Sequence, residues 1–337
     1  MVTMIQSFRR AGILLLGLLM VVILGLMSVT AQDGPNESGN GLRIDRLRQE
    51  YLMTGGQSET YEVGLTNVSS GDLTVFTVVN DFESDDETGQ PRLLIDPEEP
   101  SPFSLARYVT VPETFTLKPN ESQDVTIGVN LPDSIAPGGY FGVVRFAAGV
   151  EGEEAQNISL AASVGSLLLV SVAGEVQESM ELGFVEARQT LSDGTKRGGS
   201  FFETEPDVIA VNLRNTGNSI LKPFGRVSVK NIFGQEVANY EFNGGQLRGN
   251  VLPQSARTFE DSVSGLGRIG RFTVESNISY GEGGGNIINA KTNFWVIPWK
   301  ILLAVLVVIA FLVWFFTRGI KAYNRRVVSR AKKTSQN

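Results

Sequence analysis

The chain has 337 residues, of which 42% are hydrophobic and 19% are charged, and this balance excludes a chain that is disordered throughout. It contains neither cysteine nor histidine. Their absence excludes disulfides, thiol nucleophiles, catalytic triads with an imidazole base, and zinc sites built from imidazole or thiolate. The length suits two domains with accessory segments.

Residues 1–31 have the layout of a secretory signal peptide. Arg9 and Arg10 form a positive start, an apolar run extends from Ala11 to Met27, and small residues precede Gln32. This order of charge, apolar run and small residues is typical of a cleaved signal. An uncleaved membrane anchor is the alternative that the slightly long apolar run leaves open.

A second apolar segment, residues 297–317, is predicted to be a transmembrane helix. It reaches the roughly 20 residues that a helix needs to cross a bilayer, and Trp295, Trp299 and Trp314 are placed near the two interfaces. Residues 318–337 form a basic tail without acidic residues. Because positive charge beside a span stays in the cytoplasm, we expect a single-pass type I protein of the plasma membrane, with its domains extracellular and its C-terminus cytoplasmic.

All 36 acidic residues lie between the two hydrophobic segments, so this stretch is strongly acidic although the whole chain carries a net charge of only −7. An acidic surface repels phosphate backbones, so nucleic acid is not expected as a partner.

The acidic stretch is predicted to be all-β. After a polar spacer at residues 32–40, apolar and polar residues alternate in several short runs that turn residues separate. In one run, Tyr61, Val63 and Leu65 would share a face. The pattern predicts two tandem Ig-like antiparallel β-sandwiches, residues 41–178 and 179–294, plus one C-terminal transmembrane α-helix. The boundary falls near Glu175–Glu181.

A weak internal repeat supports this division. The run from Val63 to Ser69 is similar to the run from Val211 to Gly217, and each is a predicted strand that ends in Asn. The pairs Leu117–Ser122 with Leu252–Ser255, and Gly139–Val143 with Gly270–Val274, follow in the same order. The two units therefore look like the same type of sandwich.

The first unit resembles a family of bacterial surface proteins. The similarity rests on Asn80–Phe82, Arg107–Val109, Phe115–Ser122, Val125–Val129, Pro132–Asp133 and Ala136–Gly142. Together these segments resemble the N-terminal domain of the WxL-interacting proteins, which have a signal peptide, two Ig-like domains, a membrane helix and a short basic tail. The resemblance implies a peptidoglycan-binding type of first domain and a second domain that binds a partner.

One acidic cluster is a candidate for metal binding. Five carboxylates fall within seven residues, namely Asp81, Glu83, Asp85, Asp86 and Glu87. Carboxylate oxygens are the ligands that Ca²⁺ prefers, but the spacing is not that of an EF-hand, and an ordinary solvated loop is the alternative. A glycosidase pair would need two of these groups at a fixed separation across a cleft, which the sequence does not reveal.

Three other motifs match known patterns by their letters alone. Gly265–Gly270 matches a dinucleotide fingerprint, but a strand rather than a helix is predicted to follow it, so we expect a loop and no cofactor. Ser329–Lys332 matches the Ser-x-x-Lys pattern of penicillin-recognising enzymes within the basic tail. Five Asn-x-Ser triplets, at Asn36, Asn67, Asn120, Asn157 and Asn277, are expected to mark exposed turns.

Three functional hypotheses follow. The first is a non-enzymatic surface protein whose Ig-like domains bind a cell-wall polymer or a surface protein. Aromatic residues that could stack on sugars, unless they belong to the core, are Phe82, Phe103, Tyr108, Tyr140 and Phe141. The second is an assembly or signalling subunit that acts through its transmembrane helix and basic tail. The third is an envelope hydrolase that uses carboxylates such as Asp81 and Glu83.

Overall fold

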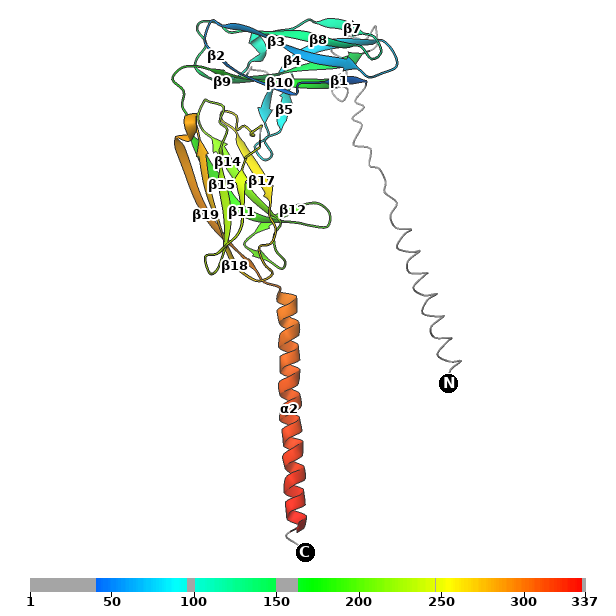
Figure 1. Cartoon of the computed structure of the whole chain (residues 1–337), viewed down its shortest axis with the longest axis vertical. Coiled ribbons are helices and arrows are strands. Elements are labelled where there is room, and N and C mark those ends of the chain that lie inside the picture. Colours follow the sequence, from blue (N-terminus) through cyan, green and yellow to red (C-terminus); the bar gives the residue numbers. More distant parts are fainter. Residues whose placement is uncertain (1–40, 96–100, 150–162, 246, 335–337) are drawn as a thin grey trace, which may run out of the picture. The chain divides into compact units, whose positions relative to one another are not determined.

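The computed structural model describes residues 41–95, 101–149, 163–245 and 247–334, with side chains as far as Arg318. Its described part is two β-sandwiches followed by one long helix, which confirms the predicted fold class (Figure 1). The predicted signal peptide and spacer lie outside the described residues.

The first sandwich pairs a sheet of order β1-β3-β8-β6 with a larger sheet of order β2-β10-β9-β4-β5, in which β7 also pairs with β4. A short 3-10 turn, η1 (Ala106–Tyr108), precedes β6. The strands are β1 (Leu42–Ile44), β2 (Arg48–Met53), β3 (Ser58–Asn67), β4 (Leu73–Ser84), β5 (Pro91–Leu94), β6 (Val109–Thr110), β7 (Thr114–Leu117), β8 (Ser122–Asn130), β9 (Gly138–Gly149) and β10 (Ser163–Val172).

The second sandwich pairs a sheet of order β12-β11-β14-β17 with one of order β13-β19-β18-β15-β16. A 3-10 turn, η4 (Glu282–Gly284), links β18 to β19. The strands are β11 (Met180–Thr190), β12 (Lys196–Gly199), β13 (Phe201–Phe202), β14 (Val208–Asn215), β15 (Phe224–Asn231), β16 (Glu236–Phe242), β17 (Ala256–Ser262), β18 (Gly270–Tyr280) and β19 (Asn286–Val296).

Alternation of side chains places one face of each strand in a core. On β3, Tyr61, Val63 and Leu65 are all buried while Glu62 is exposed, which confirms that the three share a face. They pack with β8 residues such as Ile127 in the core of the first sandwich. A separate core built around residues such as Phe242 and Phe294 fills the second sandwich.

The predicted antiparallel pairing has one parallel exception at an edge of each sandwich. Strand β2 pairs in parallel with β10, and β13 pairs in parallel with β19. In both sandwiches two successive early strands belong to different sheets. In the first sandwich β1 lies in the smaller sheet and β2 in the larger one, and in the second sandwich β12 and β13 are divided in the same way. Each parallel pair therefore closes the edge of the larger sheet with a segment from the start of its own sandwich.

A buried asparagine at the end of an equivalent strand gives the internal repeat a structural basis. Asn67 Nδ2 donates to the carbonyl oxygens of Gly71 (2.8 Å) and Leu117 (3.0 Å), and Oδ1 accepts from the amide of Ser69 (2.8 Å). Asn215 repeats the pattern with the carbonyls of Ser219 and Val251 and the amide of Gly217, at 2.7, 3.0 and 2.9 Å. Both side chains are fully buried.

A proline turn completes the same unit in both sandwiches. Asn120 and Gln254 each follow a proline and have positive φ, at 61° and 55°. The carbonyl oxygen of the residue that follows accepts a hydrogen bond from the backbone amide of the buried asparagine. Asn67 donates to Glu121 (2.9 Å), and Asn215 donates to Ser255 (2.8 Å). The third sequence pair matches as strands, but Phe272 faces the core of the second sandwich while Phe141 faces out of the first.

Helix α2 (Trp299–Thr334) follows the second sandwich. Its first 20 residues, Trp299–Arg318, contain an 18-residue window with a mean hydropathy of 2.6, and by length and composition they could span a membrane. The helix begins two residues later than predicted and continues past the predicted end at residue 317. It continues because the segment after residue 317 is rich in Arg and Lys, which are good helix formers, and contains no proline.

We expect Asn67→Ala and Asn215→Ala each to lower the free energy of unfolding by about 2–4 kcal/mol, because each change leaves buried backbone groups without partners. Urea denaturation followed by circular dichroism would measure the loss. Asn239→Ala on the exposed side of β16 serves as the matched control, with an expected change below about 0.5 kcal/mol. Equal effects at the buried and exposed positions would contradict the structural role of the asparagines.

Candidate functional site

The strongest candidate site lies where the two sandwiches meet, a surface that we call the seam. Its apolar part covers the outer face of the larger sheet of the first sandwich. There Phe82, Phe141, Val143 and Leu169 form a buried cluster with Leu252 of the second sandwich. The rings of Phe82 and Phe141 lie 5.1 Å apart between centroids. Burying this face stabilises the contact between the sandwiches, since apolar area removed from water contributes roughly 25 cal/mol per Å².

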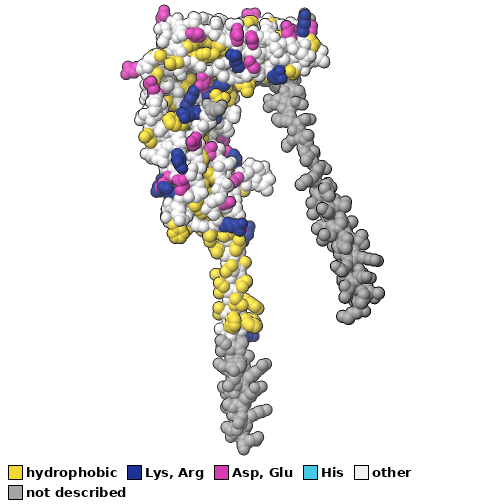
Figure 2. All heavy atoms as spheres, in the orientation of Figure 1, with side chains coloured by type: hydrophobic (Ala, Val, Ile, Leu, Met, Phe, Trp, Pro, Cys, Tyr) yellow, Lys and Arg dark blue, Asp and Glu magenta, His cyan; other side chains and the backbone are white. Residues whose placement is uncertain are grey.

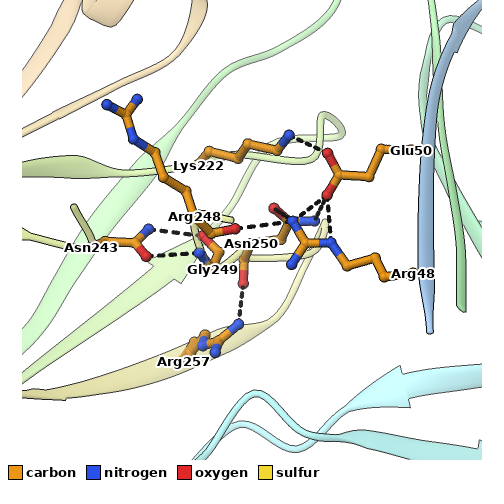
Figure 3. Close-up of polar contacts among 8 residues, drawn as sticks. All are labelled: Arg48, Glu50, Lys222, Asn243, Arg248, Gly249, Asn250 and Arg257. Carbon is orange, nitrogen blue, oxygen red and sulfur yellow. Dashed lines mark hydrogen bonds and ion pairs between the residues drawn. The ribbon is translucent and has the colours of Figure 1, made fainter. Parts of the chain in front are cut away.

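A polar cluster centred on Glu50 of β2 crosses the seam beside these residues (Figure 3). Its carboxylate accepts from Lys222 Nζ, from Asn250 Nδ2 at 3.0 Å and from Arg48 Nε at 2.7 Å. Arg48 also donates to Asn250 Oδ1 (3.2 Å) and to the carbonyl oxygen of Arg248 (3.0 Å). One carboxylate and one guanidinium of the first sandwich therefore hold three residues of the second.

The loop that carries Asn250 is held in shape from within the second sandwich. Asn243 donates to the carbonyl oxygens of Pro223 (2.7 Å) and Gly249 (2.9 Å) and accepts from the amide of Gly249 (2.7 Å). Arg257 donates to the carbonyl oxygen of Asn250 at 3.1 Å. The loop thus presents Asn250 to Glu50 in a fixed position (Figure 3).

Backbone hydrogen bonds join the sandwiches on either side of the Glu50 cluster. The amide of Gly139 donates to the carbonyl oxygen of Asn218 (2.7 Å), and Asn218 Nδ2 donates to the carbonyl oxygen of Pro137 (3.1 Å). The amide of Thr258 donates to the carbonyl oxygen of Glu87 at 3.0 Å. A side chain at Gly139 would lie 2.5 Å from Ile220, so the close approach requires glycine there.

A cleft of about 800 Å³ opens at the seam beside the apolar cluster. Phe82 and Phe141 are only 3% and 4% exposed, so they form its floor as part of the apolar cluster of the seam. Phe103, whose ring stacks on Phe141 at 6.0 Å, is half-buried and presents aromatic surface to the cleft. The polar lining residues are Glu83, Ser84, Asp85, Asp86, Gln90, Arg92, Ser101, Gln254 and Ser255.

Of the aromatic residues considered for stacking on sugars, Tyr108 and Tyr140 do not line this cleft. Both are partly buried against the core of the first sandwich. The Tyr140 hydroxyl donates to the carbonyl oxygen of Ala136 at 3.0 Å. The structure therefore brings three of the five aromatic residues together at the seam, and of these three Phe103 alone is not fully buried.

Two residues of the predicted acidic cluster are engaged within the first sandwich. Asp81 is buried and accepts from Ser104 Oγ at 2.8 Å and from the amide of Ala106 at 3.4 Å. Glu83 forms an ion pair with Arg92 across the β4–β5 hairpin.

The other carboxylates of the cluster shape the hairpin tip and reach across the seam. Asp85 accepts from the amide of Glu87 (2.9 Å) and from Thr88 Oγ1 (2.9 Å), and these bonds lower its pKa. Asp86 accepts from the amide of Ala256 at 3.0 Å and lies 3.4 Å from Arg214. Within the described ranges no group of three or more acidic residues is arranged to hold a metal ion. Calcium binding by this loop stays a prediction.

The remaining sequence motifs lie away from the cleft. Gly265–Gly270 covers the end of the loop after β17 and the first residue of β18, so a strand follows the glycines, as expected. Ser329–Lys332 lies in α2, in the part whose side chains are not described. The expectation that Asn67 marks an exposed turn is wrong, because its side-chain amide is buried and donates to the carbonyl oxygen of Leu117. Asn36 and Asn157 lie outside the described residues.

Sequence reasoning missed Glu50, Arg48, Lys222 and Asn250. A signal for the seam was nevertheless present in β10, where Leu167–Val170 is an unbroken apolar run. A strand that faces water on one side alternates, so an unbroken run indicates that both faces are covered. Leu168 indeed lies in the core, whereas Leu169 lies in the apolar cluster of the seam.

The pKa of Glu50 gives the seam a pH dependence. Burial alone would raise this pKa, but the hydrogen bonds from Lys222 and Asn250 and the charge of Arg48 outweigh burial and lower the pKa below that of an ordinary glutamate. A lowered pKa contributes stability above the unfolded-state value, and that stability is lost as the pH falls through the folded-state pKa.

We therefore expect Glu50→Gln to lower the free energy of unfolding by about 1 kcal/mol at pH 7, after allowance for solvent screening. The difference from wild type should shrink as the pH falls below about 4. Thermal unfolding at pH 7 and pH 3 would measure it, with the exposed Glu62→Gln as control. A difference that is the same at both pH values would show that the charge of Glu50 does not hold the seam.

Comparisons with known proteins give fold likeness alone. No family model and no curated protein matches the chain, so no family model supports the resemblance to the WxL-interacting proteins. Among solved structures, the class 5 fimbriae chaperone CfaA has a TM-score of 0.36 at 12% identity, over 76% of this chain and 99% of its own.

Two further solved structures have similarly low TM-scores and sequence identities. The Pseudomonas aeruginosa CupB2 chaperone has a TM-score of 0.32 at 10% identity, over 74% of this chain and 98% of its own. The Salmonella enterica SafA pilin in complex with the SafB chaperone has a TM-score of 0.33 at 12% identity, over 76% of this chain and 95% of that chain. At such values the likenesses carry no argument about function.

Proposed function

We propose that this chain is a non-enzymatic, membrane-anchored surface protein that binds an envelope partner in the cleft at the seam. The observation that carries the proposal is the cleft itself, about 800 Å³ between two docked domains. Ligand sites typically have volumes of roughly 300–1,000 Å³, occur at domain junctions and combine apolar walls with a few polar groups. The aromatic floor and the charged rim of this cleft have that composition.

The placement of the carboxylates favours binding over hydrolysis. Asp81, Asp85 and Asp86 accept hydrogen bonds from the protein, and Glu83 is paired with Arg92. A general acid needs a raised pKa. In the described part of the chain, burial raises the pKa of the Asp261 carboxyl. Asp261 lies on β17 and does not line the cleft, so it could not act as a general acid there.

We propose a peptidoglycan-like polymer as the ligand. The exposed face of Phe103 can stack on a sugar ring, since an aromatic ring offers a large flat apolar surface. Arg92 and Gln90 line the same cleft and can donate hydrogen bonds to hydroxyl and carbonyl oxygens of a glycan or its peptide. A surface protein is the other partner class that such a cleft would accept.

The membrane anchor in this proposal is the apolar part of α2. Residues Trp299–Arg318 are long and apolar enough to cross a bilayer, and described side chains in this part are exposed. Arg318 stacks over the Trp314 ring at 5.2 Å, which suits a cation and an aromatic ring at the cytoplasmic interface. The signal peptide and basic tail support a type I orientation, with both sandwiches outside.

The continuation of α2 to Thr334 favours a second candidate function. A helix of 36 residues is about 54 Å long, which exceeds the roughly 30 Å of a hydrocarbon core. The cytoplasmic part would then be a helix on which other membrane proteins could assemble. Exchange of residues 301–337 for an unrelated anchor should abolish an assembly role and leave binding in the cleft intact.

Retention on isolated peptidoglycan sacculi tests the polymer proposal. We expect the detergent-solubilised full chain to co-sediment with sacculi, and Phe103→Ala and Arg92→Ala each to weaken retention about 5- to 10-fold, the value of a lost ring or charged contact. Arg226→Ala on the second sandwich is the matched control for Arg92, because both arginines are exposed and paired with a glutamate.

The outcomes separate the partner classes. Retention that is equal for wild type, Phe103→Ala and Arg226→Ala would contradict binding in the cleft. A chain that does not sediment with sacculi, but captures a surface protein in a manner that depends on Phe103, would replace the polymer with a protein partner. Unchanged unfolding midpoints for each variant would confirm that the fold is retained.

A further inference from the structure

Large apolar side chains stand exposed at one end of the second sandwich, and we call them the basal rim. They are Phe201, Ile232, Phe233, Ile269 and Trp295, and their exposed fractions run from 38% for Trp295 to 84% for Phe233. In Figure 2 hydrophobic and basic side chains gather at the end of the sandwich from which the helix leaves. Water-exposed clusters of this kind mark contact surfaces.

Strand register shows that the rim residues share this end. Trp295 pairs with Phe201 on one side and with Arg271 on the other. On the other side of β18, Asn231 of β15 pairs with Phe272, one residue from Arg271.

The two loop tips of the rim follow from the same register. Ile232 and Phe233 form the turn directly after Asn231, where β15 ends. Ile269 directly precedes Gly270, which pairs with Val296, the last residue of β19. The rim therefore surrounds the point at which the chain leaves the sandwich.

The connection from the rim to α2 is short and held by hydrogen bonds. Ile297 and Pro298 alone separate β19 from the helix. The amide of Ile297 donates to the carbonyl oxygen of Phe202 at 2.8 Å, and Lys300 in the first turn of the helix pairs with Glu203 at 2.9 Å. Three peptide units span at most about 11 Å, so the end of β19 lies within that distance of Trp299.

We propose that the basal rim inserts into the headgroup layer of the membrane that α2 crosses. This inference rests on the proposed membrane anchoring. The headgroup layer adds roughly 5–8 Å to each side of the hydrocarbon core. With Trp299 at the interface, a connector of this length places the rim at the depth of the headgroups, where Trp and Phe side chains are favoured.

The charges around the rim suit a lipid surface with anionic headgroups. Arg268 and Arg271 are exposed beside Ile269. The nearby acidic groups are engaged, since Glu203 pairs with Lys300 and Glu205 accepts from the amide of Gly267 at 3.2 Å. Basic residues among apolar ones are the composition of surfaces that lie in a membrane interface.

The absence of native cysteine permits a direct test by site-directed spin labelling of the full chain. The chain would be reconstituted into vesicles of phosphatidylcholine and phosphatidylglycerol at 3:1, with a single label at Ile232→Cys. We expect the ratio of oxygen to water-soluble nickel accessibility to be several-fold higher there than at Glu282→Cys. Glu282 is exposed in η4, at the opposite end of the same sheet.

A label at Val308→Cys in the middle of the apolar segment separates the two proposals. A lipid-like label at Val308 with a water-like label at Ile232 would overturn the rim insertion and leave the anchor in place. A water-like label at Val308 would overturn both. A label at Ile232 that is shielded from oxygen and nickel alike would show that a protein, such as a second copy of this chain, covers the rim instead.

Discussion

The outer face of the larger sheet in the first sandwich is too apolar to be left in water. Phe82, Phe141, Val143 and Leu169 all point out of the core that their own sheet helps to form. Leu252 and Ile220 of the second sandwich cover them, so the two sandwiches share a hydrophobic cluster in addition to their separate cores. The remaining features of the seam lie around this contact.

Polar groups at the seam fix the register that a non-directional apolar contact leaves open. Glu50 meets one cation and one amide from the second sandwich, while backbone bonds at Gly139 and Thr258 join the sandwiches elsewhere along the seam. The acidic hairpin tip contributes Asp86 to the same contact. A cleft bordered by such fixed groups keeps its shape without a ligand, which lowers the entropic cost of binding.

Periodicity was sufficient to predict strands such as β3, the two sandwiches and the apolar helix, since each is a local property of the sequence. The repeat was visible in the sequence. The reason for it, a buried asparagine that donates to one carbonyl far along the chain, depends on segments that no local pattern brings together. Glu50 and Lys222 are 172 positions apart, and no local pattern pairs them. The aromatic residues were found, but the sequence did not reveal that Phe82 and Phe141 form the floor of the cleft while Phe103 remains available.

The parallel pair of β13 and β19 has a mechanical consequence. Tension between a ligand held at the seam and an anchor in the bilayer would enter the sandwich through β19, which leads directly to α2. That strand is bonded along its length to β18 and at its end to β13. A pull along the strand axis loads these bonds together in shear, instead of opening them one after another, so the attachment resists detachment by force.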